Sequence, residues 1–176
     1  MRARLILVSL LILLSACVTI PDSYAPPIQR KPIDGIEPAA GKAFVRMGET
    51  SAASYIVGDV NEAIEGGGWR WTKRKPTLRL QLKRITNQKF EADLTIAANT
   101  FRETGPVSIT FTINDHELAR ESYTEAGRHT FKKAVPAEWL HMAGDNIVTM
   151  EIDKLWTSPL DGVELGFILA SAGFVE

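Results

Sequence analysis

The sequence predicts an all-β domain of antiparallel strands over residues 42–176, from three observations. Apolar and polar residues alternate in several segments, beginning with 78–82, in which Leu78, Leu80 and Leu82 are apolar. Such alternation places apolar side chains on one face of a strand and polar ones on the other. Residues typical of turns separate these segments. No segment in this region has the periodicity of a long amphipathic helix, so we expect a β-sandwich or a β-barrel.

The first residues have the pattern of a bacterial lipoprotein signal. Arg2 and Arg4 precede an apolar run that ends in Leu14-Ser15-Ala16-Cys17. A signal peptide has the same order, a positively charged region followed by an apolar region and a cleavage site. These last four residues resemble the lipobox, whose cysteine is acylated on sulfur and becomes the new N-terminus. The alternatives are an ordinary secretory signal and a transmembrane anchor, although the run is shorter than the about 20 apolar residues of a spanning helix. We expect residues 1–16 to be removed and Cys17, the only cysteine, to carry the membrane anchor.

The chain after this signal is close to electrically neutral. Cleavage before Cys17 leaves 176 − 16 = 160 residues with 18 basic and 21 acidic side chains, because Arg2 and Arg4 leave with the signal. Without a basic excess, no nucleic-acid partner is expected. In lipoproteins an aspartate after the cysteine retains the protein in the inner membrane. Val18 therefore implies the periplasmic face of the outer membrane, if the host has two membranes.

A proline-rich linker is expected between the anchor and the domain. Five of the nine prolines fall within residues 17–41, and this segment shows no hydrophobic periodicity. Such spacers extend by up to about 3.1 Å per residue. We interpret residues 17–41 as a tether that holds the domain, residues 42–176, away from the membrane.

Four further segments alternate like the first, and short turn signals separate them. The segments are 90–96, 107–113, 148–152 and 163–169. The turn signals are Asn87-Gln88, Gly105-Pro106, Asn114-Asp115, Gly127, 144–146 and Asp161-Gly162. Residues 136–140 are expected to form one helical turn, because proline is favoured at a helix start. The basic run 73–75 before Pro76 is expected to be a solvated turn between strands.

The order and spacing of these segments resemble the galactose-binding-like jelly roll over roughly residues 50 to 176. The resemblance starts at Gly68-Trp69-Arg70-Trp71-Thr72 and continues through 78–82, 107–114, 131–140, 144–148 and 161–166. It implies a jelly-roll β-sandwich of the type found in many non-catalytic carbohydrate-binding modules. The acidic loop pattern of calcium-dependent members is not evident. We therefore expect neither a metal nor another cofactor.

Catalytic motifs are not evident in the sequence. No serine lies in a G-x-S-x-G turn, and His116, His129 and His141 do not form a metal-binding pair. Asp115 and Glu117 flank His116 at an expected hairpin tip. The glycines 66–68 lack the lysine of a phosphate-binding loop. A pair of carboxylates that meet only in the fold is left open, but no pair is indicated, and we expect no enzyme.

Three residues are candidates for ligand binding. Trp156 lies in an expected loop with a proline between two strands, where an indole either packs on the protein or binds an apolar sugar face. Arg102 precedes Gly105-Pro106 in another expected loop and has hydrogen-bond donors for hydroxyl groups. Tyr123, also expected in a loop, is the third candidate.

The other tryptophans are expected to be structural. Trp69 and Trp71 are two residues apart, so that both point to one face of a strand. There we expect them to cap the sandwich core. Trp139, in the expected helical turn, is interpreted as a lid over the core.

Two functions are consistent with these features. The first is a non-catalytic envelope lipoprotein that binds a glycan or assists in polysaccharide metabolism. The second is a structural or assembly lipoprotein that binds another envelope protein through an exposed strand edge or an apolar patch. Binding to a glycan array favours the first, and co-purification of an envelope protein favours the second.

Overall fold

The computed structural model describes residues 41–176, which belong to one compact unit, Pro38–Glu176. The expected signal, the lipidated Cys17, Val18 and nearly all of the linker lie outside the described residues. No helix within residues 41–176 is both long and apolar enough to span a membrane. All strand pairings described below lie within Pro38–Glu176, which also has its own hydrophobic core. These are the properties of a domain that folds by itself.

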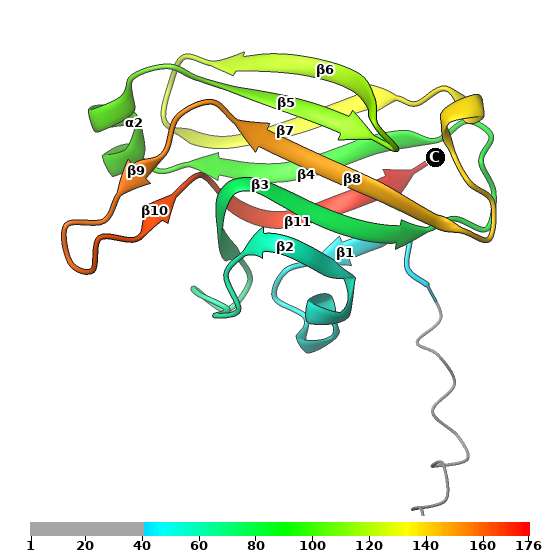
Figure 1. Ribbon diagram of the computed structural model, residues 1–176, viewed down its shortest axis with the longest axis horizontal. Coiled ribbons are helices and arrows are strands. Elements are labelled where there is room, and N and C mark those ends of the chain that lie inside the picture. Colours follow the sequence, from blue (N-terminus) through cyan, green and yellow to red (C-terminus); the bar gives the residue numbers. More distant parts are fainter. Residues whose placement is uncertain (1–40) are drawn as a thin grey trace, which may run out of the picture. The chain divides into compact units, whose positions relative to one another are not determined.

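Residues 41–176 fold mainly into strands, with one short α-helix and two 3₁₀ helices (Figure 1). In chain order the elements are β1 (Phe44–Arg46), η1 (Thr50–Tyr55), β2 (Ile56–Val60), β3 (Arg70–Gln81), β4 (Lys89–Ile96), α2 (Ala98–Thr104), β5 (Val107–Ile113), β6 (His116–Tyr123), β7 (Gly127–Ala134), η2 (Ala137–Trp139), β8 (Asp145–Ile152), β9 (Trp156–Thr157), β10 (Glu164–Leu165) and β11 (Ile168–Val175).

The strands form two antiparallel layers that share one corner. One layer, called the β5 sheet, has the order β6-β5-β8-β3-β2, and the other, called the β4 sheet, has the order β7-β4-β11-β1. They join where Ile168 and Leu169 of β11 pair with Trp71 and Arg70 of β3. A separate pair, β9 and β10, lies at one end. The expected all-β sandwich of antiparallel strands is confirmed, and its jelly-roll order follows because successive strands repeatedly change sheet.

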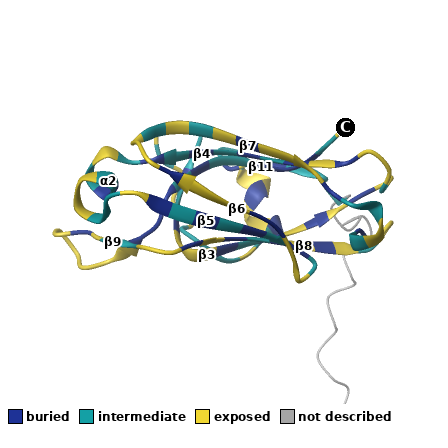
Figure 2. Ribbon diagram, turned by 90° about the horizontal axis from the view of Figure 1, so that it is seen from above, coloured by how far each residue is buried: buried dark blue, intermediate teal, exposed yellow. Residues whose placement is uncertain are grey.

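The hydrophobic core lies between the two sheets. Phe111 of β5 stacks on Phe131 of β7 with ring centroids 3.7 Å apart and an interplanar angle of 5°. Phe90 of β4 contacts both rings at 6.2–6.3 Å. Buried residues alternate with exposed or partly exposed ones along β4, β5 and β8 (Figure 2). In the segments 78–82, 90–96, 107–113 and 148–152, every apolar residue of the alternating set is buried, as predicted.

The basic run 73–75 is not a turn, and this prediction was wrong. It lies inside β3, where all three side chains are exposed. Before the run, β3 pairs with β11 in the β4 sheet, and from Thr77 onward it pairs with β8 in the β5 sheet. The basic residues therefore occupy the stretch in which one long strand crosses between sheets, and an exposed strand segment has the same composition as a turn.

The expected strand 163–169 is interrupted. Glu164 and Leu165 form β10, β11 begins at Ile168, and Val163 is exposed. The break occurs at Gly166, whose N–H donates to Thr72 O at 2.8 Å. A Cβ at this glycine would lie 2.5 Å from the carbonyl oxygen of Lys73. This close approach of two backbones forces the chain out of regular strand geometry.

Two of the expected local structures are present. Asn114 and Asp115 have φ values of 47° and 68° and form the tight turn between β5 and β6, which confirms the hairpin tip. The helical turn expected at 136–140 is η2. The sequence did not predict α2, and η1 was not predicted either.

Candidate binding groove on the outer face of the β4 sheet

Trp69 and Trp71 lie on the outside of the sandwich, and the expectation that they cap its core was wrong. Arg70 and Thr72, the residues of opposite parity in the same strand, are 3% and 0% exposed and point inward. Alternation along the strand then turns both tryptophans outward, where each is partly exposed. Their rings meet edge to face, with centroids 6.1 Å apart and an interplanar angle of 87°.

Strand register places Trp71 beside a polar row on this outer face. Trp71 pairs with Ile168 of β11, which in turn pairs with Thr95 of β4. The next outward row crosses all four strands of the β4 sheet and consists of Arg46, Ser171, Asp93 and Thr130. A β-bulge between Leu169 and Ser171 lets neighbouring residues of β11 face outward together. An aromatic edge therefore adjoins a surface of hydrogen-bonding groups.

A groove of about 400 Å³ runs over this row, and we call it the outer-face groove. Its lining residues come from β1 and the following turn, the glycine turn before β3, β4 and β11. They are Arg46, Gly48, Glu49, Gly67, Gly68, Asp93, Ala170 and Ser171. Half of them are glycine or alanine, and the others are Arg46, Glu49, Asp93 and Ser171, so the lining combines small residues with polar side chains.

The glycine turn shapes one wall of the groove. Gly66 and Gly67 have φ values of 52° and 74°, a conformation that L-residues with side chains rarely adopt. A Cβ at Gly66 would lie 2.4 Å from Nε1 of Trp69. A Cβ at Gly48 would lie 2.7 Å from Cα of Gly68, so the two turns pack closely. The glycines 66–68 thus hold Trp69 against the turn, which gives them a structural role.

Ion pairs fix the charged side chains of this face. Arg128 donates from Nε to Asp93 Oδ1 at 2.8 Å, and from Nη2 to Oδ2. Lys132 Nζ lies 2.7 Å from Glu91 Oε2. The hydrogen bond and charge of Asp93 raise the pKa of Arg128. Arg128 and Lys132 are therefore each balanced by a carboxylate of β4.

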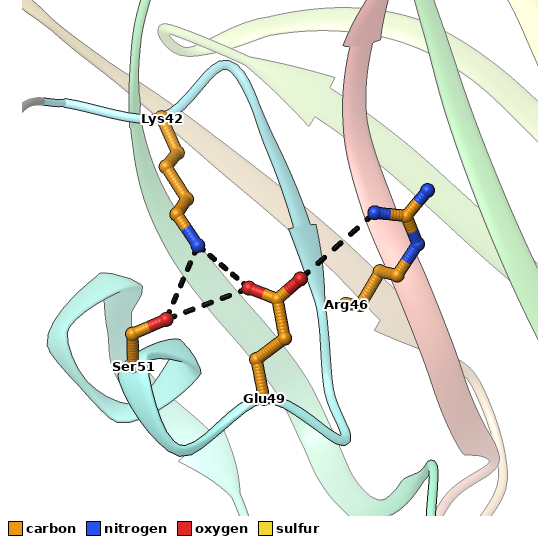
Figure 3. A network of polar contacts seen from close by, with 4 residues as sticks. All are labelled: Lys42, Arg46, Glu49 and Ser51. Atoms are coloured by element: carbon orange, nitrogen blue, oxygen red, sulfur yellow. Dashed lines mark hydrogen bonds and ion pairs between the residues drawn. The ribbon is translucent and has the colours of Figure 1, made fainter.

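Glu49 is held between two cations at the edge of the groove (Figure 3). Lys42 Nζ donates to Glu49 Oε2 at 2.6 Å, and Arg46 Nη1 lies 3.9 Å from Oε1. Ser51 Oγ is 3.4 Å from Oε2 and accepts a hydrogen bond from Lys42 Nζ at 3.2 Å. The hydrogen bond from Lys42 is the main cause of a lowered pKa at Glu49. Glu49 is therefore a fixed hydrogen-bond acceptor.

Trp156 extends the aromatic edge, although it does not lie in a loop as expected. It forms β9 and pairs with Leu165 of β10. Its ring lies 6.3 Å from that of Trp71 at an interplanar angle of 34°, and it is partly exposed. Its Nε1 is buried and has no hydrogen-bond partner among residues 41–176. Trp69, Trp71 and Trp156 together are called the aromatic cluster.

Arg102 and Tyr123 do not lie in loops either. Arg102 is on α2, which lies next to β9 (Figure 1), and its exposed guanidinium is 3.8 Å from Glu103 Oε1. Tyr123 ends β6, is 9% exposed, and its ring contacts His129 at 4.8 Å. Burial, with the nearby charge of Glu121, raises the pKa of Tyr123 to about 12. Tyr123 is therefore part of the core, and its role in ligand binding stays a prediction.

Trp139 has the structural position that was expected. It is partly buried and packs against the core. Its ring stacks on His116 with centroids 4.9 Å apart, and its carbonyl oxygen accepts a hydrogen bond from Asn114 Nδ2 at 2.7 Å.

The Trp-x-Trp pair was the sequence signal for the aromatic cluster beside the groove, but its face was assigned incorrectly, and neither tryptophan lines the groove itself. Arg46, Asp93 and Ser171 were not singled out, because their strands are far apart in the sequence and only register brings them together. Within residues 41–176 there is no cluster of three histidine, cysteine or acidic side chains able to hold a metal ion.

No protein-family model and no curated protein matches the chain. Similar solved structures include a family 35 carbohydrate-binding module from Clostridium thermocellum, with 9% identity and a TM-score of 0.44 over 71% of this chain and 94% of that one. The carbohydrate-binding module CBM36 in complex with calcium and xylotriose has 12% identity and a TM-score of 0.44 over 75% and 98%. A family GH115 4-O-methyl-α-glucuronidase has 11% identity and a TM-score of 0.46 over 88% of this chain and 19% of that longer one. With so little identity, these similarities assign no ligand to this chain.

Proposed function

We propose that this protein is a non-catalytic envelope lipoprotein whose domain binds a glycan in the outer-face groove. The observation that carries the proposal is the register of Trp71, a partly exposed indole placed one row from Arg46, Ser171 and Asp93. Sugars present an apolar ring face and a rim of hydroxyl groups. An indole can stack on the apolar ring face, and fixed polar side chains can form hydrogen bonds with the hydroxyl groups.

The charges of the groove favour a neutral glycan. Asp93 is paired with Arg128, and Glu49 with Lys42, so that neither carboxylate needs a cation from the ligand. Paired carboxylates remain good acceptors for hydroxyl donors. The lowered pKa of Glu49 does not suit a general acid at neutral pH.

The membrane context of the proposal comes from the sequence. The lipobox-like residues 14–17 supply the anchor at Cys17, and Val18 supports sorting to the outer membrane. A single acyl chain anchors only marginally, at about 0.8 kcal/mol per buried methylene, while two or more anchor stably. The glycan would then be one that is present outside the cytoplasm.

A glycan array with the isolated unit Pro38–Glu176 tests this function. We expect the wild-type unit to bind a restricted set of neutral glycans, and Trp71→Ala to lose that binding while the unit remains folded. Ile147→Ala is the matched control, since Ile147 is an exposed apolar residue of β8 in the other sheet. No binding by the wild-type unit, or equal binding by Trp71→Ala, would contradict the proposal.

The alternative is an assembly lipoprotein, and one observation favours it. Leu160, between β9 and β10, is 96% exposed, and Val163 in the same connection is 37% exposed. Exposed apolar side chains of this kind occur at protein interfaces. Under this alternative, Leu160→Asp would prevent an envelope protein from co-purifying with the chain from membranes, and Trp71→Ala would not.

A further inference from the structure

A second cavity lies beside β2, apart from the outer-face groove. Its volume is about 530 Å³, and it is lined by residues of η1, β2, the following loop and the start of β3. Its walls are largely aliphatic and include Ala53, Ile56, Val57, Val60 and Ile64. It shares no lining residue with the outer-face groove. A ligand bound here would be independent of the glycan proposed above.

One charged group is buried at this cavity, the guanidinium of Arg70. The residue is only 3% exposed. Nε donates to Met47 O at 3.0 Å, and Nη1 donates to Asn61 O at 3.4 Å and to Glu62 O at 2.5 Å. Within residues 41–176, Nη2 has no hydrogen-bond partner, and no carboxylate forms an ion pair with Arg70.

Among the described residues, the guanidinium of Arg70 is held by carbonyl groups and by no carboxylate, and its Nη2 is not fully buried, so it is accessible from the cavity. Removing a charge from water is costly unless it is paired, and carbonyl dipoles supply only part of what a carboxylate supplies. The three carbonyl contacts hold the guanidinium of Arg70 in place, so its orientation is fixed before any ligand arrives. Nη2 keeps two N–H groups that can donate charge-assisted hydrogen bonds to a carboxylate.

We propose that this cavity binds a small aliphatic carboxylate. The carboxylate accepts hydrogen bonds from Nη2 of Arg70, and the hydrocarbon part contacts the aliphatic walls formed by η1 and β2. The exposed side chain of Glu62 also lines the cavity, and its charge disfavours a ligand with more than one negative charge. The site therefore selects a singly charged acid with an apolar body.

Methyl resonances in NMR spectra of the Pro38–Glu176 unit report on this cavity, and octanoate is the probe. We expect a saturable shift of the methyl groups of Ile56, Val57, Val60 and Ile64, with a Kd of about 1 mM, as for a weak ligand of this size. Octanol has a similar chain without the charge, and acetate has the charge without the chain. Each should bind at least tenfold more weakly than octanoate.

Two variants test separately the contribution of the Arg70 charge and that of the cavity volume to octanoate binding. Arg70→Gln should weaken octanoate binding at least tenfold and bring it close to that of octanol. Ala53→Trp fills the cavity from an exposed position and leaves Arg70 intact, so it should also prevent the octanoate shifts even if Arg70→Gln fails to fold. Equal affinity for octanoate and octanol, shifts centred outside the cavity, the absence of any shift, or unchanged binding by Ala53→Trp would each overturn the proposal.

Discussion

Trp71 and Trp156 face each other with ring centroids 6.3 Å apart and an interplanar angle of 34°, and this contact joins the long strand β3 to the short strand β9. Trp69 adds a third ring at 6.1 Å from Trp71. Each ring is therefore held by a neighbouring ring, and each remains partly exposed. An aromatic surface of fixed geometry loses little side-chain entropy when a ligand stacks on it.

The contact between the two indoles also has a consequence for stability. We expect Trp156→Ala to destabilise the domain by about 2 kcal/mol, less than the about 3–5 kcal/mol of a fully buried aromatic, because Trp156 is only partly buried. Trp156→Phe should cost less than about 1 kcal/mol, since it keeps an aromatic ring and removes an N–H without a partner among residues 41–176. Urea denaturation measures both. If Trp156→Phe lowered the free energy of unfolding as much as Trp156→Ala, this prediction would be contradicted.

The core makes a sharper prediction for stability. Phe111 is fully buried and stacks on Phe131, whereas Thr110 of the same strand is only partly buried and points away from the core. Phe111→Ala should destabilise by about 3–5 kcal/mol, and Thr110→Ala by less than about 1 kcal/mol. Denaturant titrations of the two variants check the assignment. Similar losses at both positions would be incompatible with this strand having one buried face.

Tyr123 predicts how stability changes at alkaline pH. Its pKa is about 12 in the folded protein and near 10 when the chain is unfolded. Because the folded pKa is the higher one, the stabilisation is fully present below about pH 10 and is lost as the pH rises toward 12. Between pH 9 and pH 11, the free energy of unfolding of the wild-type unit should fall by about 1 kcal/mol more than that of Tyr123→Phe. Urea titrations at pH 9, 10 and 11 measure this difference. Parallel pH profiles would mean that Tyr123 is not protected by burial.

The lipid anchor gives a prediction about maturation. Cys17→Ser should leave the protein at precursor size or cause aberrant processing, without incorporation of labelled palmitate, because a hydroxyl group cannot form the thioether that precedes cleavage. Immunoblotting and lipid labelling in the host check this. Normal maturation of the variant, with unchanged membrane retention, would exclude the lipoprotein interpretation.

Much of the fold could be predicted because alternation is a local property. The buried sets in 78–82, 90–96, 107–113 and 148–152 follow directly from the period of two in the sequence. The strand β6 was less visible, since its burial pattern does not alternate strictly. The short helix α2 was not predicted, because neither of its ends has a side-chain cap.

The candidate site was less predictable because it depends on register. The alternation rule correctly placed Trp69 and Trp71 on one face, but it could not decide which face. The buried pair of this segment is Arg70 and Thr72, both polar, so the usual apolar-inside rule gives the wrong orientation. Arg70 donates from Nε and Nη1 to three carbonyl groups, and Thr72 Oγ1 donates to Phe167 O at 2.8 Å. These tertiary bonds do not appear in a sequence pattern.

The most direct test of the central claim is to map glycan binding by NMR, with the best ligand from the array added to isotopically labelled Pro38–Glu176. We predict that the indole N–H signals of Trp69 and Trp71 and the amide signals of Gly67, Asp93 and Ser171 shift together and saturate with one Kd. The amides of β6, in the opposite sheet, should not move. Shifts confined to residues outside the aromatic cluster and the outer-face groove would contradict the account.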